Sequence, residues 1–97
     1  MKKVRTFKEY LYDEERISKE EREAILLEAD LICKMIEARE EKGLTQKQLA
    51  DKIGLKQPAI ARLEKQKVVP KIDTMLKILV SLGYTLKIVP LKAEAES

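Results

Sequence analysis

Three capping boxes divide this chain into helices. In each, a Ser or Thr is followed three residues later by Glu or Gln, so that the two side chains satisfy backbone N–H groups at a helix start. The pairs are Thr6 with Glu9, Ser18 with Glu21, and Thr45 with Gln48. Glycines, which adopt the left-handed conformation without strain, follow three of the expected helices, at Gly43, Gly54 and Gly83. This pattern predicts an all-α chain with tight turns.

Apolar residues recur with helical spacing between these boundaries and predict five helices. We expect them at about 7–12, 19–42, 45–53, 57–65 and 71–82, with Pro58 in the first turn of the fourth. On the longest helix, one apolar stripe predicts a buried face, made of Leu27, Leu31, Met35 and Ala38.

The segment Tyr84–Val89 alternates with period two, is rich in β-forming residues and is closed by Pro90. No second strand is predicted, so this strand would have to pair with another chain. We expect 84–90 to be a dimerisation strand that buries Tyr84, Leu86 and Ile88, and 91–97 to be a flexible tail.

The 97 residues suit one small domain. No apolar run approaches the roughly 20 residues that span a bilayer, and the start is not a secretory signal. Cys33 is the single cysteine, which favours a reducing compartment, and we expect a cytoplasmic protein in which Cys33 is a packing residue. The chain has no His, no Gly-rich phosphate loop and no metal-ligand cluster, so we expect neither an enzyme nor a cofactor.

Charge is unevenly distributed along the chain. Residues 43–71 hold seven Lys or Arg against two Asp or Glu, a net charge of +5 that suits a polyanion. Residues 13–30 hold eight acids against three bases, a net charge of −5 that suits a basic partner.

From Gln46 onward the sequence resembles the helix-turn-helix of the Cro/C1 (Xre) family, over about 31–83. The resemblance rests on an apolar and a small residue, an apolar-Gly-apolar turn and two apolar anchors, which are Leu49, Ala50, Ile53-Gly54-Leu55, Ile60 and Leu63. Ala50 is small where two helices cross, and Gly54 allows the turn. The alternative is an ordinary helical hairpin in a bundle.

The resemblance implies that residues 57–65 form a recognition helix in the DNA major groove. Base readout would then fall to Gln57, Ala59 and Arg62. The expected phosphate contacts are Thr45, Gln46, Lys47, Lys56, Lys65 and Lys67. In the family, the residue at Gln46 also supports the one at Gln57, and Arg39 and Glu64 occupy the positions of a structural ion pair. Two departures from the pattern are Pro58, in place of a hydrogen-bonding residue, and Gln66, in place of a glycine.

The order of the segments is similar to that in antitoxins of the HigA type, which add an N-terminal segment to the DNA-binding domain. This similarity implies a homodimeric repressor of its own operon that binds operator DNA and neutralises a RelE-like ribonuclease toxin. We expect residues 1–30 to bind the toxin through Phe7, Tyr10, Leu11, Asp13, Glu14 and Glu15. The fold would be a five-helix Cro/C1-type domain with an N-terminal helical extension and one C-terminal β-strand pairing in trans. The alternatives are a stand-alone Cro/C1-type regulator without a toxin and a protein-interaction adaptor.

Overall fold

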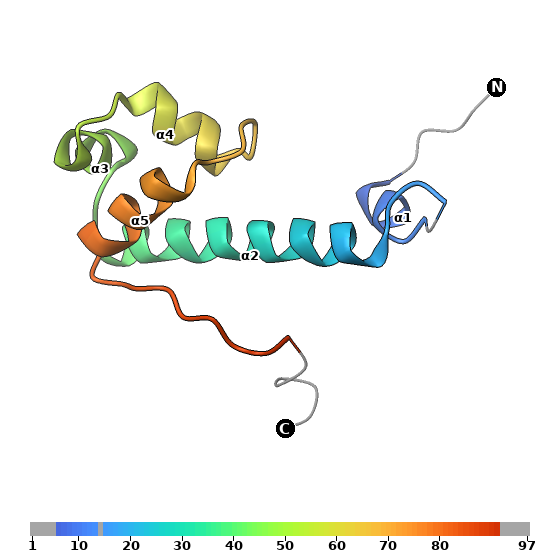
Figure 1. Cartoon of the computed structure of the whole chain (residues 1–97). Helices are drawn as coiled ribbons and strands as arrows, with labels where there is room; N and C mark the ends of the chain where they lie inside the picture. The colour runs from blue at the N-terminus through green and yellow to red at the C-terminus, as the bar shows by residue number, and fades with distance from the viewer. Residues whose placement is uncertain (1–5, 14, 92–97) are drawn as a thin grey trace.

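The computed structural model describes residues 6–13 and 15–91. This part of the chain forms five helices, which are α1 (Phe7–Leu11), α2 (Lys19–Glu41), α3 (Gln46–Ile53), α4 (Gln57–Glu64) and α5 (Ile72–Ser81). All five predicted helices are confirmed, with ends that differ from the expectation by no more than one residue. Helices α3, α4 and α5 gather at one end of the long α2, and α1 lies at the other end (Figure 1).

The three predicted capping boxes are all present at helix starts. At α3, for example, the Thr45 hydroxyl accepts from the backbone N–H of Gln48 at 3.0 Å, and the backbone N–H of Thr45 donates to Gln48 Oε1 at 2.8 Å. The same reciprocal bonds start α1 at Thr6 and α2 at Ser18. Short-range side-chain chemistry therefore sets where these helices begin.

The hydrophobic core joins the second half of α2 to α3, α4 and α5. Its buried side chains are Ile32, Met35, Ala38, Leu49, Ala50, Ile60, Leu63, Met75, Ile78 and Leu82. Ala50, which is completely buried, provides the small side chain expected where α3 meets its neighbours. This core holds α4 on the body of the domain, with its other face outward.

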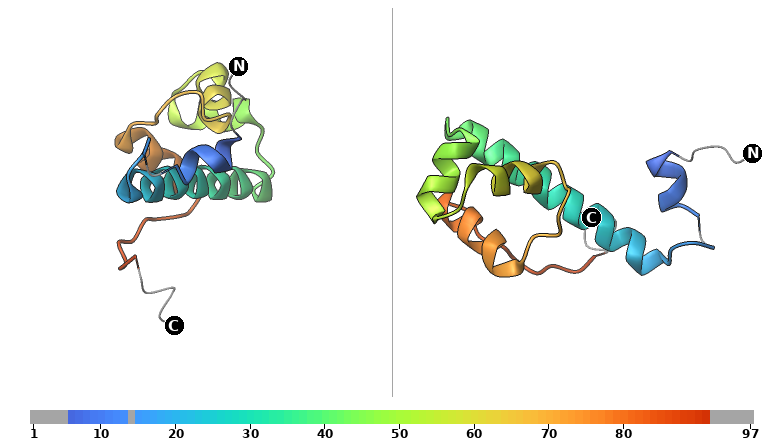
Figure 2. Two further views of the ribbon diagram at one scale, coloured as in Figure 1. Left: turned by 90° about the vertical axis from the view of Figure 1, so that its right-hand side faces the viewer. Right: turned by 90° about the horizontal axis from the view of Figure 1, so that it is seen from above.

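The first half of α2 extends beyond this core, as the view from above shows (Figure 2). Leu27 was expected on the buried stripe, but it is 65% exposed, because it lines an open groove beside the start of α5 and is not part of the core. At the far end, Leu11 and Ile17 are buried, and the guanidinium of Arg22 lies 4.8 Å from the centre of the Tyr12 ring. We call residues 6–30, as far as they are described, the arm.

The exit from α4 shows how the chain replaces the expected glycine. Gln66 adopts φ = 58°, a left-handed conformation that costs an L-residue roughly 1–2 kcal/mol. The backbone N–H of Gln66 donates to Leu63 O at 3.0 Å and that of Lys67 to Arg62 O at 2.9 Å. Gln66 therefore makes a left-handed turn that a glycine would adopt without strain.

The C-terminal segment leaves α5 after Gly83, where the backbone N–H of Tyr84 caps the helix by donating to Leu79 O at 2.8 Å. It then passes on the side of α2 opposite α4, and within 84–91 it forms no ladder with the rest of the described chain (Figures 1 and 2). Leu86, Ile88 and Val89 are exposed, Ile88 completely. Pairing in trans stays a prediction.

The expectation for Cys33 was wrong. Cys33 is exposed, because it lies next to Ile32 on a helix and therefore about 100° around the axis from the side chain that enters the core. None of the described helices is long and apolar enough to cross a membrane.

Candidate nucleic-acid interface

The surface that faces outward from α4 carries the residues expected to contact bases. Ile60 and Leu63 face the core, whereas Gln57 and Arg62 are exposed. Ala59 and Ala61 are half-buried beside them and add little bulk. The exposed face of α4 therefore presents two long polar side chains next to two small alanines. A large, flat partner can approach such a surface closely.

The turn between α3 and α4 sets the position of this surface. Gly54 ends α3 with φ = 78°, and the backbone N–H of Leu55 donates to Ala50 O at 2.8 Å. Lys56 precedes α4 with an extended backbone and supplies no side-chain cap. The predicted helix-turn-helix is thus present, with its second helix opened by Gln57-Pro58.

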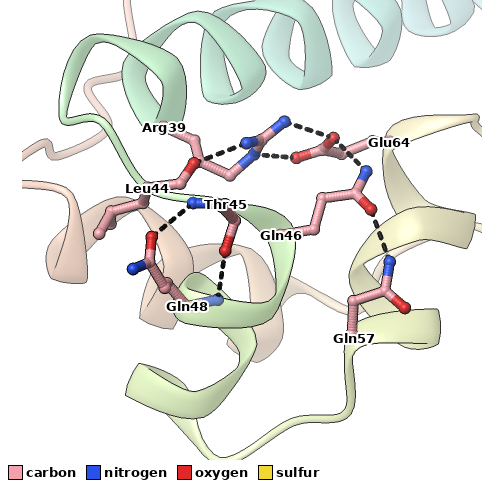
Figure 3. Close-up of polar contacts among 7 residues, drawn as sticks. All are labelled: Arg39, Leu44, Thr45, Gln46, Gln48, Gln57 and Glu64. Carbon is pink, nitrogen blue, oxygen red and sulfur yellow. Dashed lines mark hydrogen bonds and ion pairs between the residues drawn. The ribbon is translucent and has the colours of Figure 1, made fainter.

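A chain of hydrogen bonds runs from the interior of the domain to the start of α4 (Figure 3). Arg39 donates to Glu64 through Nε at 2.6 Å and through Nη2 at 3.0 Å, and through Nη1 to Leu44 O at 2.7 Å. Gln46 Nε2 donates to Glu64 Oε1 at 2.9 Å, and Gln57 Nε2 donates to Gln46 Oε1 at 2.7 Å. We call these four side chains the relay.

The relay contains two contacts that the sequence analysis expected and one that it did not. The ion pair between Arg39 and Glu64 and the support of Gln57 by Gln46 both form. The bond between Gln46 and Glu64 was not foreseen, because the ion pair was treated as separate from the base-contacting residues. No sequence signal indicates this contact, since it joins residues 18 positions apart on different helices.

The expected phosphate contacts surround this surface but are not equivalent. Lys56, Lys65 and Lys67 are exposed and flank the two ends of α4. Lys47 is also exposed, but its Nζ lies 2.9 Å from Asp51 Oδ2, one turn along α3. The Thr45 hydroxyl is engaged in its capping box, which leaves the backbone N–H groups of Gln46 and Lys47 at the helix start without an intrahelical acceptor.

Comparison with known proteins agrees with this geometry. Residues 35–89 match the model of the helix-turn-helix family HTH_3. The chain is 44% identical over 88 residues to an uncharacterised HTH-type transcriptional regulator of Haemophilus influenzae. This alignment covers 91% of this chain and 85% of the relative. It also resembles a chain of a toxin–antitoxin module from Streptococcus pneumoniae, with 43% identity, a TM-score of 0.63 and coverage of 91% of this chain and 94% of that one.

The chain belongs to the Cro/C1-type helix-turn-helix family. It is therefore a DNA-binding regulator of a non-enzymatic class.

Two further surfaces of this helix-turn-helix protein lie away from α4. On the arm, Phe7 is 62% and Tyr10 38% exposed, but Leu11 is buried and does not contribute to the outer face. Asp13 and Glu15 lie in the turn after α1, while Glu14 lies outside the described residues.

An apolar groove of about 270 Å³ lies where the arm meets the domain, between α2 on one side and the start of α5 with the segment that precedes it on the other. Leu27, Val69 and Ile72 line it and are 65%, 81% and 66% exposed. Glu28 also lines this groove. The sequence analysis did not predict this groove, since the apolar stripe that includes Leu27 was expected to be buried.

Proposed function

We propose that this helix-turn-helix protein is the antitoxin of a toxin–antitoxin pair, which acts in the cytoplasm as a dimeric repressor of its own operon and neutralises a RelE-like ribonuclease. The observation that carries the proposal is the similarity to the Streptococcus pneumoniae toxin–antitoxin module, because it extends over 91% of this chain and so includes the arm as well as the DNA-binding domain.

In this proposal α4 enters the major groove of operator DNA. Arg62 donates a bidentate pair to guanine, Gln57 contacts adenine, and the methyl group of Ala59 faces a thymine methyl. Phosphate contacts from Gln46, from the start of α3 and from the exposed lysines orient the domain. The net charge of +5 over residues 43–71 supports this placement.

The arm is the proposed toxin-binding region. Its exposed aromatic residues, Phe7 and Tyr10, provide contact area, and its net charge of −5 over residues 13–30 complements a basic, RNA-binding partner. The groove beside Leu27 continues this surface toward the domain. Binding at α1 leaves α4 uncovered, since α1 and α4 lie toward opposite ends of α2 (Figure 1).

The test uses the neighbouring reading frame of the same operon, which the proposal expects to encode a short basic RelE-like protein. Expressed alone, that protein should stop growth, and the full chain should restore it. Phe7→Glu and Tyr10→Glu should impair the rescue and weaken the purified complex at least tenfold, because each places a charge in an apolar contact. Val80→Glu is the matched control, since Val80 is 69% exposed and lies near the end of α5, which in Figure 1 is at the end of α2 away from α1.

Deletion of residues 1–30 should abolish neutralisation and leave measurable DNA binding, because every core residue of the DNA-binding domain lies beyond position 30. If the shortened protein still blocked the toxin, the contact would lie elsewhere on the chain. If the neighbouring protein had no effect on growth and did not bind, the chain would be a stand-alone regulator.

A further inference from the structure

Pro58 lies at the centre of the face that α4 turns away from the core. Ile60 and Leu63, the anchors of this helix, are buried, whereas Pro58 is exposed in its first turn. Successive side chains of an α-helix point about 100° apart, so that of Pro58 lies about 160° around the axis from Ile60 and about 140° from Leu63. The side chain of Gln57 lies only about 60° from that of Ile60. In the first turn of α4, Pro58 therefore points most directly outward.

The neighbours of Pro58 leave its ring accessible to a partner. Arg62 lies one turn farther along the same face and is exposed, while Ala61 is short and half-buried. The amide of Gln57 is held on the side of α3, because its Nε2 donates to Gln46 Oε1 at 2.7 Å. An apolar ring thus occupies the outward face of α4 between two long polar side chains.

The chemistry of proline restricts what this ring can contact. Pro has no backbone N–H, and its side chain has neither a donor nor an acceptor. In the major groove guanine, adenine and cytosine present polar groups, whereas thymine presents its C5 methyl group beside O4. A ring that covered a polar base edge would displace water and leave that edge without a hydrogen-bond partner, which is unfavourable. Contact with the thymine methyl group instead removes apolar surface of both partners from water.

We propose that Pro58 is a specificity-determining residue that recognises a thymine of the operator through its C5 methyl group. The position at which the family pattern has a hydrogen-bonding residue then selects a base by apolar contact. Because only the methyl group is contacted, the protein distinguishes thymine from uracil, and 5-methylcytosine from cytosine. This inference rests on the proposed function, in which α4 enters the major groove.

The experiment starts from the duplex that the full-length wild-type protein selects from a randomised pool. Each thymine is replaced in turn by uracil, which lacks only the C5 methyl group, at the equivalent position of both half-sites together. Burial of one such group changes affinity by about fourfold, so the loss of two should weaken binding by roughly 15-fold. The methyl group of Ala59 faces a thymine in the proposed function, so more than one position should respond.

Pro58→Ser assigns one of these responses to Pro58. The substitution removes the ring, and because Pro58 is exposed and lies outside the hydrophobic core, the variant should fold, which thermal unfolding verifies. At the thymine that Pro58 contacts, the ratio of the affinities for the thymine and uracil duplexes should fall to about one. Ala59→Gly is the matched control, since it should keep the wild-type ratio at this position and lose it at another. With cytosine at this position, methylation at C5 should strengthen binding by the wild type but not by Pro58→Ser.

A purely structural role, in which Pro58 only stiffens the start of α4, would weaken binding of Pro58→Ser to the thymine and uracil duplexes alike. Unchanged ratios at every position in this variant would therefore overturn the inference. A selected site without thymine, or wild-type affinity that no uracil replacement lowers, would also overturn it. If the wild-type protein bound the selected duplex no better than random DNA, the proposed function itself would be wrong, and the inference with it.

Discussion

Arg39 and Glu64 form a two-point ion pair, with N···O distances of 2.6 and 3.0 Å, that fastens the last residue of α4 to α2. Their side chains are only 10% and 6% exposed, and Arg39 also binds the backbone carbonyl of Leu44, just before α3. One buried guanidinium therefore joins three segments of the DNA-binding domain. The pair holds the recognition helix at its C-terminal end, while the relay extends from Glu64 to its N-terminal end.

Removing one partner of this ion pair should destabilise the domain strongly. Glu64→Leu leaves a buried, unpaired guanidinium and should lower the free energy of unfolding by about 3–5 kcal/mol. The double variant Arg39→Met with Glu64→Leu should lose less than the single variant, because no buried charge remains. Urea denaturation measures both, and a double variant less stable than Glu64→Leu would contradict this account of the pair. Lys47→Ala, which breaks an exposed pair with Asp51, is the control and should change stability by less than about 1 kcal/mol.

Arg62 and Lys67 should affect DNA binding in different ways, although both are exposed and basic. Arg62→Ala should lose about 1–3 kcal/mol of discrimination at one base pair, because a bidentate contact to guanine disappears. Lys67→Ala should weaken binding to all duplexes alike and reduce the slope of log affinity against log salt by about 0.9, as expected for one lost phosphate contact. Fluorescence anisotropy with a duplex that the wild-type protein selects from a randomised pool, and with a random duplex, distinguishes these two roles. Equal losses on both duplexes for Arg62→Ala would rule out base readout by this residue.

If the protein dimerises through residues 84–90, substitutions on one face of this segment should separate the two protomers. Ile88→Asp places a charge on the face expected to be buried, and Leu86→Pro removes a backbone N–H from the expected ladder. Neither residue is buried in the single chain, where Leu86 is 42% and Ile88 101% exposed, so both variants should fold and sediment as monomers.

Val89→Asp is the matched control for this experiment, since Val89 is 67% exposed and lies on the opposite face of the predicted strand. It should sediment as the wild type does. If Ile88→Asp and Leu86→Pro stayed dimeric at micromolar concentration, the dimer would use a helix face instead. The outer side of α5, where Leu76 and Val80 are exposed, would be the next candidate.

The sequence predicted the features of the fold that short-range chemistry controls. Thr45 and Gln48 are three residues apart, so a start of α3 could be recognised from their spacing alone, and the left-handed Gly54 follows from the same kind of local rule. Cys33 and Leu27 were both predicted to pack in the interior but are exposed, and the reason is the same for the two residues. Helical periodicity gives the relative direction of side chains, but it does not say which faces of α2, or how much of its length, other helices cover.

The site was predicted in part. The family pattern indicated Gln57 and its support by Gln46, and, as a separate feature, the ion pair of Arg39 with Glu64. That a single carboxylate accepts from both Arg39 and Gln46 depends on where α2, α3 and α4 meet, which residue spacing does not encode. Likewise, the burial of Leu11 depends on how α1 turns onto the start of α2.

Selection of duplexes from a randomised pool by the full-length protein tests the central claim most directly, that this chain binds specific DNA as a dimer through α4. The account predicts enrichment of one palindromic site, with half-sites centred about 34–36 Å apart, or 10–10.5 base pairs, and with binding that weakens as salt rises. Arg62→Ala should lose the preference at one base pair in each half-site. Recovery of no common sequence, with equal affinity for all duplexes, would contradict the account.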